Sequence, residues 1–154
     1  MNAHNPTTPP AGLVYQAHLD PSAILALRWQ MLGAPGTTPA ACRLADDGAG
    51  AHHGLLTPEG LVVCCLSVFN RPQGLVQIRK VATHPAWQRR GLGAWLMGQA
   101  MAEAAGQGRL GVWLNARAGA EGFYQKLGFH QAGEPYLEGG VGFVRMARAL
   151  QRPA

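Results

Sequence analysis

The sequence predicts an α/β domain built on a mixed β-sheet with helices on both faces. Three strand-like runs, residues 51–57, 61–69 and 74–83, are separated by the turn signals "PEG" and "NRPQG". They predict an antiparallel meander. Apolar residues then recur at helical spacing over residues 90–105, and strands alternate with a second helix from there to residue 150. This order of elements favours a single mixed sheet.

The first part of the chain predicts one strand and one helix ahead of the meander. Residues 13–19 alternate weakly, and Asp20-Pro21 provides an N-cap followed by proline at the first helical position. The helix over residues 22–32 should end at Gly33. Residues 1–12 are rich in Pro, Thr and Asn, so we expect a flexible tail before a single domain over residues 13–154.

The second half predicts two helices and the remaining strands. Leu92, Leu96, Ala100 and Ala104 recur every four residues along the first of these helices. A strand over 109–116 and a short helix over 119–128 follow. Strands at 129–133 and 141–150 close the domain.

Composition excludes several classes of protein. Hydrophobic residues make up 47% and charged residues 14% of the 154, which argues against a disordered chain. The longest apolar run, residues 61–69, is far shorter than the roughly 20 residues of a membrane span. No basic segment followed by an apolar one opens the chain. We therefore expect a cytoplasmic protein that does not bind membranes.

The cysteines and histidines do not predict a metal site. Three cysteines are too few for a disulfide framework, and Cys64 and Cys65 should point to opposite faces of a strand. His52 and His53 should diverge in the same way. The net charge of +5 rests on scattered arginines, with no basic run, so nucleic acid is disfavoured and an anionic small ligand fits.

The segment "HPAWQRRGLGAWLM", residues 84–97, places glycines and arginines at the start of a helix. Free N–H groups and the helix dipole favour an anion there, typically a phosphate. No GxxxxGK[ST] string exists, and a dinucleotide fingerprint fails because Leu96 stands where it needs Gly or Ala. What remains is Gln88 to Gly93, the pattern [Q/R]xxGx[G/A].

At this point the sequence resembles the GNAT family of acetyl-CoA-dependent N-acetyltransferases. "VATHPAWQRRGLGAWLM" is similar to its coenzyme A-binding strand, turn and helix, and "LNARAGAEGFYQKLGF" to its second motif. The resemblance is sharp over residues 75–130. It implies a central sheet of six to seven strands, with a splayed parallel pair that binds acetyl-CoA and no metal.

The resemblance also implies which residues bind the donor. The pyrophosphate should lie on the backbone of residues 89–94, and the pantothenate arm along residues 81–83. The implied donor-binding residues are Val81, Ala82, Thr83, Gln88, Arg89, Arg90, Gly91, Leu92, Gly93, Ala94, Asn115, Phe123, Tyr124 and Lys126. Arg89, Arg90 and Lys126 could equally be solvated surface residues, and the glycines could serve helix packing alone.

Catalytic roles follow from the same resemblance. An N–H of Val81 or Ala82 would point at the thioester oxygen, and Tyr124 would protonate the leaving thiolate. Asn115 would contact the donor arm or an ordered water. Tyr124 as a core tyrosine and Asn115 as a turn former are the structural alternatives.

The general base stays open in the sequence. Some family members carry a glutamate on the strand before the loop, but this chain has Gln77 and Arg79 there. His52, His53, His84 and Glu138 are the titratable candidates, and a water wire is the alternative.

The acceptor side of the predicted site rests on the resemblance alone. Tyr136, Glu138 and Phe143 would line a partly apolar pocket with at least one carboxylate, which would suit a cationic amine of a small molecule or peptide. A coenzyme A-binding sensor or partner protein without turnover is the competing function. Residues 142–150 leave a homodimer and a monomer both open.

Overall fold

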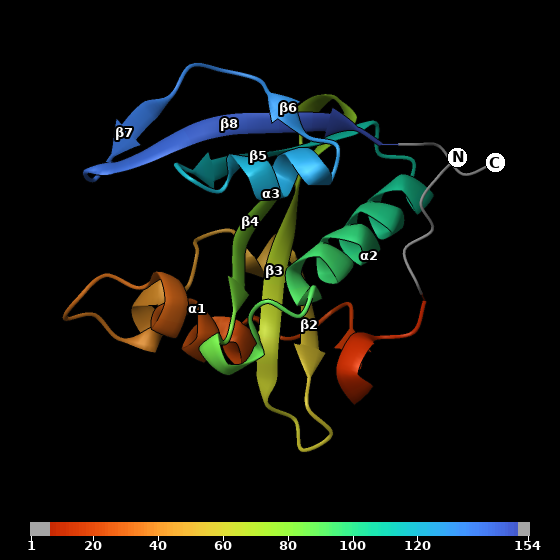
Figure 1. Ribbon diagram of the computed structural model, residues 1–154, viewed down its shortest axis with the longest axis vertical. Helices are drawn as coiled ribbons and strands as arrows, with labels where there is room; N and C mark the ends of the chain where they lie inside the picture. The colour runs from red at the N-terminus through yellow and green to blue at the C-terminus, as the bar shows by residue number, and fades with distance from the viewer. Residues whose placement is uncertain (1–6, 151–154) are drawn as a thin grey trace.

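The computed structural model describes residues 7–150, which form a mixed eight-stranded sheet flanked by three α-helices (Figure 1). The strands are β1 (Val14–Gln16), β2 (Ala51–Leu56), β3 (Val62–Arg71), β4 (Leu75–Thr83), β5 (Gly111–Arg117), β6 (His130–Gln131), β7 (Tyr136–Glu138) and β8 (Val141–Ala149). The helices are α1 (Leu25–Leu32), α2 (Leu92–Gly106) and α3 (Glu121–Lys126). Short 3₁₀ turns η1 to η6 lie at Pro10–Gly12, Pro21–Ile24, Pro39–Cys42, Asp47–Ala49, Pro72–Gly74 and Pro85–Trp87.

The sheet has the order β1-β2-β3-β4-β5-β8-β6, and β7 also pairs with β8. All neighbours are antiparallel except β4 and β5, which run parallel. The predicted meander is therefore β2 to β4. The parallel pair requires a crossover, which α2 provides.

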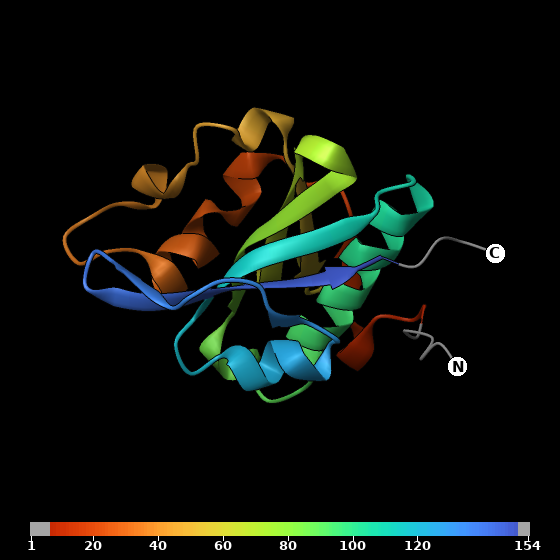
Figure 2. The same cartoon turned by 90° about the horizontal axis from the view of Figure 1, so that it is seen from above.

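Helices cover both faces of the sheet, as Figure 2 shows from above. On one face α2 buries Leu92, Leu96 and Met97 against a core that includes Cys64. On the other face Ile24 and Leu27, in η2 and α1, pack against Cys65 and Ala82. Adjacent strand residues thus point to opposite faces, as predicted for the two cysteines.

Asp20 starts the first helical segment as the sequence predicts. Its carboxylate accepts hydrogen bonds from the Ser22 N–H at 2.9 Å and the Ser22 hydroxyl at 2.7 Å. The first turn is 3₁₀ (η2), and α1 follows and ends with Gly33 as its C-cap. The helix therefore begins one turn later than the predicted α-helix.

The parallel strands β4 and β5 separate after a short contact. Only three residue pairs, Leu75–Gly111, Val76–Val112 and Gln77–Trp113, join them. The rest of β4 pairs with β3 alone, and the register of this pairing shifts between Cys65 and Ser67 of β3. Lys80 lies in this irregularity with a φ of 59°, a left-handed backbone conformation that is rare for residues other than glycine. The splayed pair implied by the family resemblance is present.

The mixed α/β fold is confirmed, with three differences in detail. The sheet has eight strands rather than six to seven, because the short strand β7 pairs with β8 and had no clear alternation to reveal it. The first strand is only three residues long. Of the predicted N-terminal tail, residues 1–6 lie outside the described residues, and Pro10–Gly12 forms a 3₁₀ turn. Within residues 7–150 no helix has the length and apolar character needed to span a bilayer.

Candidate active site

The loop before α2 has the backbone geometry of an anion-binding turn. Gly91 is the N-cap of α2 with φ 75°, and Arg89 also has a positive φ of 63°. Among the described residues, the N–H groups from Arg89 to Ala94 donate to no backbone carbonyl, and no side chain caps the helix. They are therefore available to an anion at the positive end of the helix dipole.

One further contact holds this loop against the end of β4. The Gln88 side-chain amide donates to the Thr83 carbonyl at 3.1 Å. Gly93 lies near the Phe123 ring, but a Cβ there would sit 3.5 Å from it, an ordinary contact. Tight packing therefore does not require glycine at 93, whereas the positive φ does favour glycine at 91.

The predicted cationic residues around the loop are exposed. The Arg90 guanidinium lies 4.9 Å from the centre of the Trp87 ring, a cation–π contact, and Arg89 is free of ion pairs with the other described residues. Lys126 lies exposed at the end of α3. These three side chains remain equally compatible with phosphate contact and with a solvated surface.

A cavity of about 450 Å³ opens where β4 and β5 separate. Its lining residues are Leu32, Gln77, Ile78, Arg79, Lys80, Val81, Leu114, Asn115, Arg117, Ala120, Tyr124, Tyr136, Glu138 and Phe143. The structure therefore brings Val81, Asn115 and Tyr124 together with the three residues expected on the acceptor side. Ala82 and Thr83 are on the same strand but do not line the cavity.

Tyr124 reaches the cavity from α3. Its ring packs edge-to-face against Phe123 and Phe129, with centroids 5.0 Å and 5.8 Å away. Its hydroxyl has no hydrogen-bond partner among the described residues. Burial raises the pKa of Tyr124 to about 12, so the phenol stays protonated at neutral pH.

Asn115 faces the cavity from β5. Its side-chain oxygen accepts a long hydrogen bond from Arg145 Nε at 3.4 Å, and the two residues are directly paired across β5 and β8. The Arg145 guanidinium also stacks 4.0 Å from the Trp113 ring centre. The Asn115 side chain is thus in contact with an arginine that also stacks on Trp113.

The four candidates for the general base differ in their position relative to the cavity. His84 caps the turn after β4, because its Nδ1 accepts the Ala86 N–H at 3.1 Å. His52 and His53 are fully buried, belong to separate polar networks and do not line the cavity. Glu138, on β7, is the one of the four that lines it.

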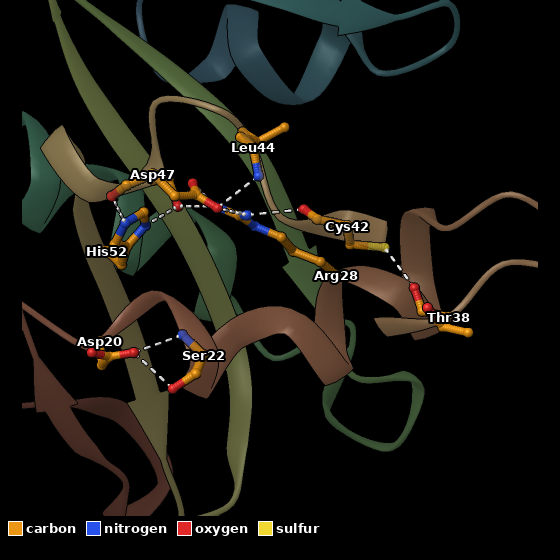
Figure 3. A network of polar contacts seen from close by, with 9 residues as sticks. Asp20, Ser22, Arg28, Thr38, Cys42, Leu44, Asp47 and His52 are labelled. Atoms are coloured by element: carbon orange, nitrogen blue, oxygen red, sulfur yellow. Dashed lines mark hydrogen bonds and ion pairs between the residues drawn. The ribbon is translucent and has the colours of Figure 1, made fainter. Parts of the chain in front are cut away.

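His52 belongs to a buried network around Arg28 of α1 (Figure 3). Arg28 donates to both carboxylate oxygens of Asp47, at 2.7 and 3.0 Å, and to the Ser67 hydroxyl at 2.8 Å. His52 binds the same hydroxyl and the Asp47 carbonyl through its two ring nitrogens, at 2.7 and 2.8 Å. These contacts join α1 to β2 and β3, which supports the cavity wall formed by Leu32.

Sequence reasoning did not expect eight of the lining residues at the site, namely Leu32, Gln77, Ile78, Arg79, Lys80, Leu114, Arg117 and Ala120. Leu32 lies in the predicted helix, but nothing local shows that its end reaches the sheet. Lys80 and Arg117 are 37 positions apart on strands that only the tertiary fold brings together. Strand alternation, applied to β4 and β5 side by side, is the signal that could have placed Arg79 and Arg117 on one face.

Three features define an acyl-donor-binding enzyme fold. They are a helix N-terminus with unpaired N–H groups, a splayed pair of parallel strands, and a tyrosine that lines the cavity between these strands. The model of the acetyltransferase (GNAT) domain matches residues 50–150. YitI of Bacillus subtilis, an uncharacterized N-acetyltransferase, is 30% identical over 108 residues, covering 66% of this chain and 72% of that protein. This chain belongs to the GNAT family and is an acetyl-CoA-dependent acyltransferase, as the sequence predicted.

Solved structures agree in fold. A Lactobacillus plantarum structure named as an N-acetyltransferase superposes with a TM-score of 0.80 at 21% identity, covering 90% of this chain and 97% of that one. A Bacillus subtilis acetyltransferase solved in complex with CoA gives a TM-score of 0.69 at 15% identity, covering 90% and 99%. At these identities the likeness concerns the fold alone.

Proposed function

We propose that the protein transfers an acetyl group from acetyl-CoA to a primary amine of a small molecule or peptide, by direct attack in a ternary complex. The observation that carries this is the cavity at the splay, which joins the free edge of β4 to the unpaired Tyr124 hydroxyl. The anion-binding turn lies at the end of the same strand.

The donor would be held by backbone groups. The amides from Arg89 to Ala94 would bind the pyrophosphate, and Gly91 shapes the turn that exposes them. The pantothenate arm would lie along β4, where an N–H of Val81 or Ala82 would point at the thioester oxygen. One such preorganised donor contributes about 3 kcal/mol when charge develops on that oxygen.

In the transfer itself, the neutral amine nitrogen attacks the thioester carbonyl and the carbon–sulfur bond breaks. Tyr124 gives its proton to the departing thiolate sulfur. Because burial raises the pKa of Tyr124 to about 12, that proton is present at neutral pH. The amine must release a proton before or during attack. Glu138, directly or through water, is the acceptor for it that lines the cavity.

A covalent acetyl-cysteine route has no support in the described part of the chain. Cys64 and Cys65 are fully buried, and burial raises the pKa of their thiols to about 11 and about 12. A thiol that stays protonated is a poor nucleophile. Cys42 is partly exposed but does not line the cavity at the splay.

The test is a thiol-release assay with acetyl-CoA and a panel of amino acids, polyamines, aminoglycosides and N-terminal peptides. Tyr124→Phe should lower kcat by roughly 10²- to 10⁴-fold while acetyl-CoA affinity, measured by calorimetry, stays within about twofold. Tyr15→Phe is the matched control, because it removes a partly buried phenol hydroxyl outside the cavity.

Two outcomes would contradict this function. If acetyl-CoA binds and no amine is acetylated, the competing function, a coenzyme A-binding protein without turnover, takes its place. If acetyl-CoA does not bind at high micromolar concentration, both functions fail.

A further inference from the structure

Three cationic side chains line the cavity at the splay. Arg79 and Lys80 come from β4 and are partly buried, and Arg117 comes from the end of β5 and is exposed. Among residues 7–150 none of them forms an ion pair. Glu138 is the single acidic residue in the lining. The cavity therefore has two more positive than negative side chains, in contrast to the pocket for a cationic amine that the sequence suggested.

Strand alternation places the two arginines on the acceptor face of the sheet. Ile78 and Leu114 belong to the core beneath α2, so Arg79 and Arg117, each an odd number of positions away, project to the opposite face, where α1 lies. Tyr124 packs against the α2 side. The two arginines thus lie across the sheet from the tyrosine that would serve the donor's sulfur.

These cations are not needed for the donor's own charge. None of the phosphate-loop residues from Gln88 to Ala94 lines this cavity. The part of acetyl-CoA that would enter it, the pantetheine arm with the thioester, is uncharged. A lining with excess positive charge, whose cations form no ion pair with the described residues, is most simply matched by an anion from the other substrate.

Lys80 is partly buried among these positive charges. Burial first, and then the charges of Arg79, Arg28 and Arg117, lower the pKa of Lys80 below its ordinary value. Its backbone is also held at a φ of 59° in the β4 irregularity. Such strain persists where the surrounding structure imposes it, and it is frequent at functional sites.

We propose that the acceptor is a small molecule that carries an anionic group close to its amine, and that Arg79, Lys80 and Arg117 bind this group. This rests on the proposed acetyl transfer at the same cavity. Arginine suits the task because its planar guanidinium donates two parallel hydrogen bonds to a carboxylate or a phosphate. Glu138, on β7, would then face the amine.

The first experiment measures binding without turnover. The protein is saturated with coenzyme A, and L-amino acids and the corresponding amino acid amides are titrated by calorimetry or NMR. Ethanolamine and phosphoethanolamine form a second matched pair, which distinguishes carboxylate from phosphate. The anionic member should bind roughly tenfold or more tightly. The double variant Arg79→Gln/Arg117→Gln should reduce this preference to within about twofold.

Kinetics with the same pairs supply the second readout. In the double variant kcat/KM should fall by a larger factor for the acid than for the amide. Arg109→Gln removes one positive charge outside the lining and should leave all of these values unchanged. A peptide with an acidic residue after its N-terminus, compared with a neutral one, tests whether a peptide acid is accepted instead.

The outcomes separate this proposal from the acetyl transfer on which it rests. Equal binding of acids and amides, or preference for polyamines, overturns the anionic acceptor even if acetyl transfer is found. Preferential binding of acids that the double variant abolishes, with no turnover of any pair, supports the anion site and overturns acetyl transfer.

Discussion

Arg28 and Asp47 form a two-point ion pair with almost no exposure to solvent. Nη1 lies 2.7 Å from Oδ2 and Nη2 lies 3.0 Å from Oδ1, with side chains 1% and 0% exposed. The Leu44 N–H also donates to Asp47 at 2.8 Å. The pair thus fixes the segment after η3 to α1 on the acceptor face of the sheet.

Neutralising Asp47 should be strongly destabilising. Asp47→Asn keeps the shape but leaves the Arg28 charge buried and uncompensated, so we expect a loss of about 3–5 kcal/mol in the free energy of unfolding. Urea denaturation measures it. Asp46→Asn is the control, since Asp46 pairs with Arg71 at 3.1 Å with a side chain 39% exposed. That variant should lose no more than about 1 kcal/mol. Equal losses in the two variants would show that burial does not govern this pair.

His53 should make the protein less stable in mild acid. Burial lowers the pKa of His53 to about 4, because Glu103 Oε2, 3.2 Å from Nε2, does not lie in a hydrogen-bonding direction and only partly offsets the burial. His53 takes up a proton near pH 6.5 in the unfolded chain and only near pH 4 in the folded chain. Stability therefore falls as the pH drops through that window, by up to about 3 kcal/mol.

Chemical denaturation at pH 7.0, 5.5 and 4.5 tests this slope. His53→Gln removes the titrating group, and its stability should change less between these pH values than that of the wild type. His84→Gln serves as the control because His84 is only a turn cap at the surface. A wild-type slope that His53→Gln leaves intact would assign the acid sensitivity to another group.

Much of the fold could be predicted because the signals were local. The turn residues between the strands of the meander, the Asp20 cap and the four-residue recurrence along α2 each specify their own element. The loop from Gln88 to Gly93 was equally local, since a helix N-terminus is built from contiguous residues. Strand β7 was not predicted because its three exposed residues, followed by two glycines, show no alternation of apolar and polar residues.

The acceptor side of the site could not be predicted in the same way. Arg79 and Arg117 read as scattered charges along the chain, and only the pairing of β4 with β5 places them beside one cavity. The left-handed backbone at Lys80 has no sequence signal, because lysine disfavours that conformation. His52 and His53 diverge as predicted, but that both are fully buried depends on long-range contacts to Tyr15 and Ser67.

The pH dependence of turnover tests the role of Tyr124. The phenol acts as an acid, so activity should be lost only as the pH rises through its pKa of about 12. We expect kcat, at saturating substrates, to show no fall between pH 7 and about 10, the ordinary pKa of tyrosine. Tyr124→Phe should give a uniformly low kcat over the same range. A limb near pH 10 in the wild type that is absent in Tyr124→Phe would mean that the tyrosine titrates as an ordinary exposed phenol.

The two loop glycines should respond differently to the same added methyl group. Gly91→Ala forces alanine to a φ of 75°, at a cost of about 1–2 kcal/mol, so the turn should relax and tilt the N–H groups that face the phosphates. We expect acetyl-CoA affinity to fall roughly tenfold or more. In Gly93→Ala the added Cβ would lie 3.5 Å from the Phe123 ring and 3.9 Å from the Thr83 hydroxyl, both ordinary contacts, and the loop pattern itself admits alanine there. Its affinity should stay within about threefold.

Calorimetry of acetyl-CoA binding, with the melting temperature of each variant, separates affinity from folding. Gly106→Ala is a further control, since its added Cβ lies in open space at the far end of α2. If Gly93→Ala weakened binding as much as Gly91→Ala, close approach of the donor to residue 93 would matter more than the turn. If neither variant changed the affinity, the phosphates would not lie on these amides, because the backbone geometry at Gly91 is what exposes them.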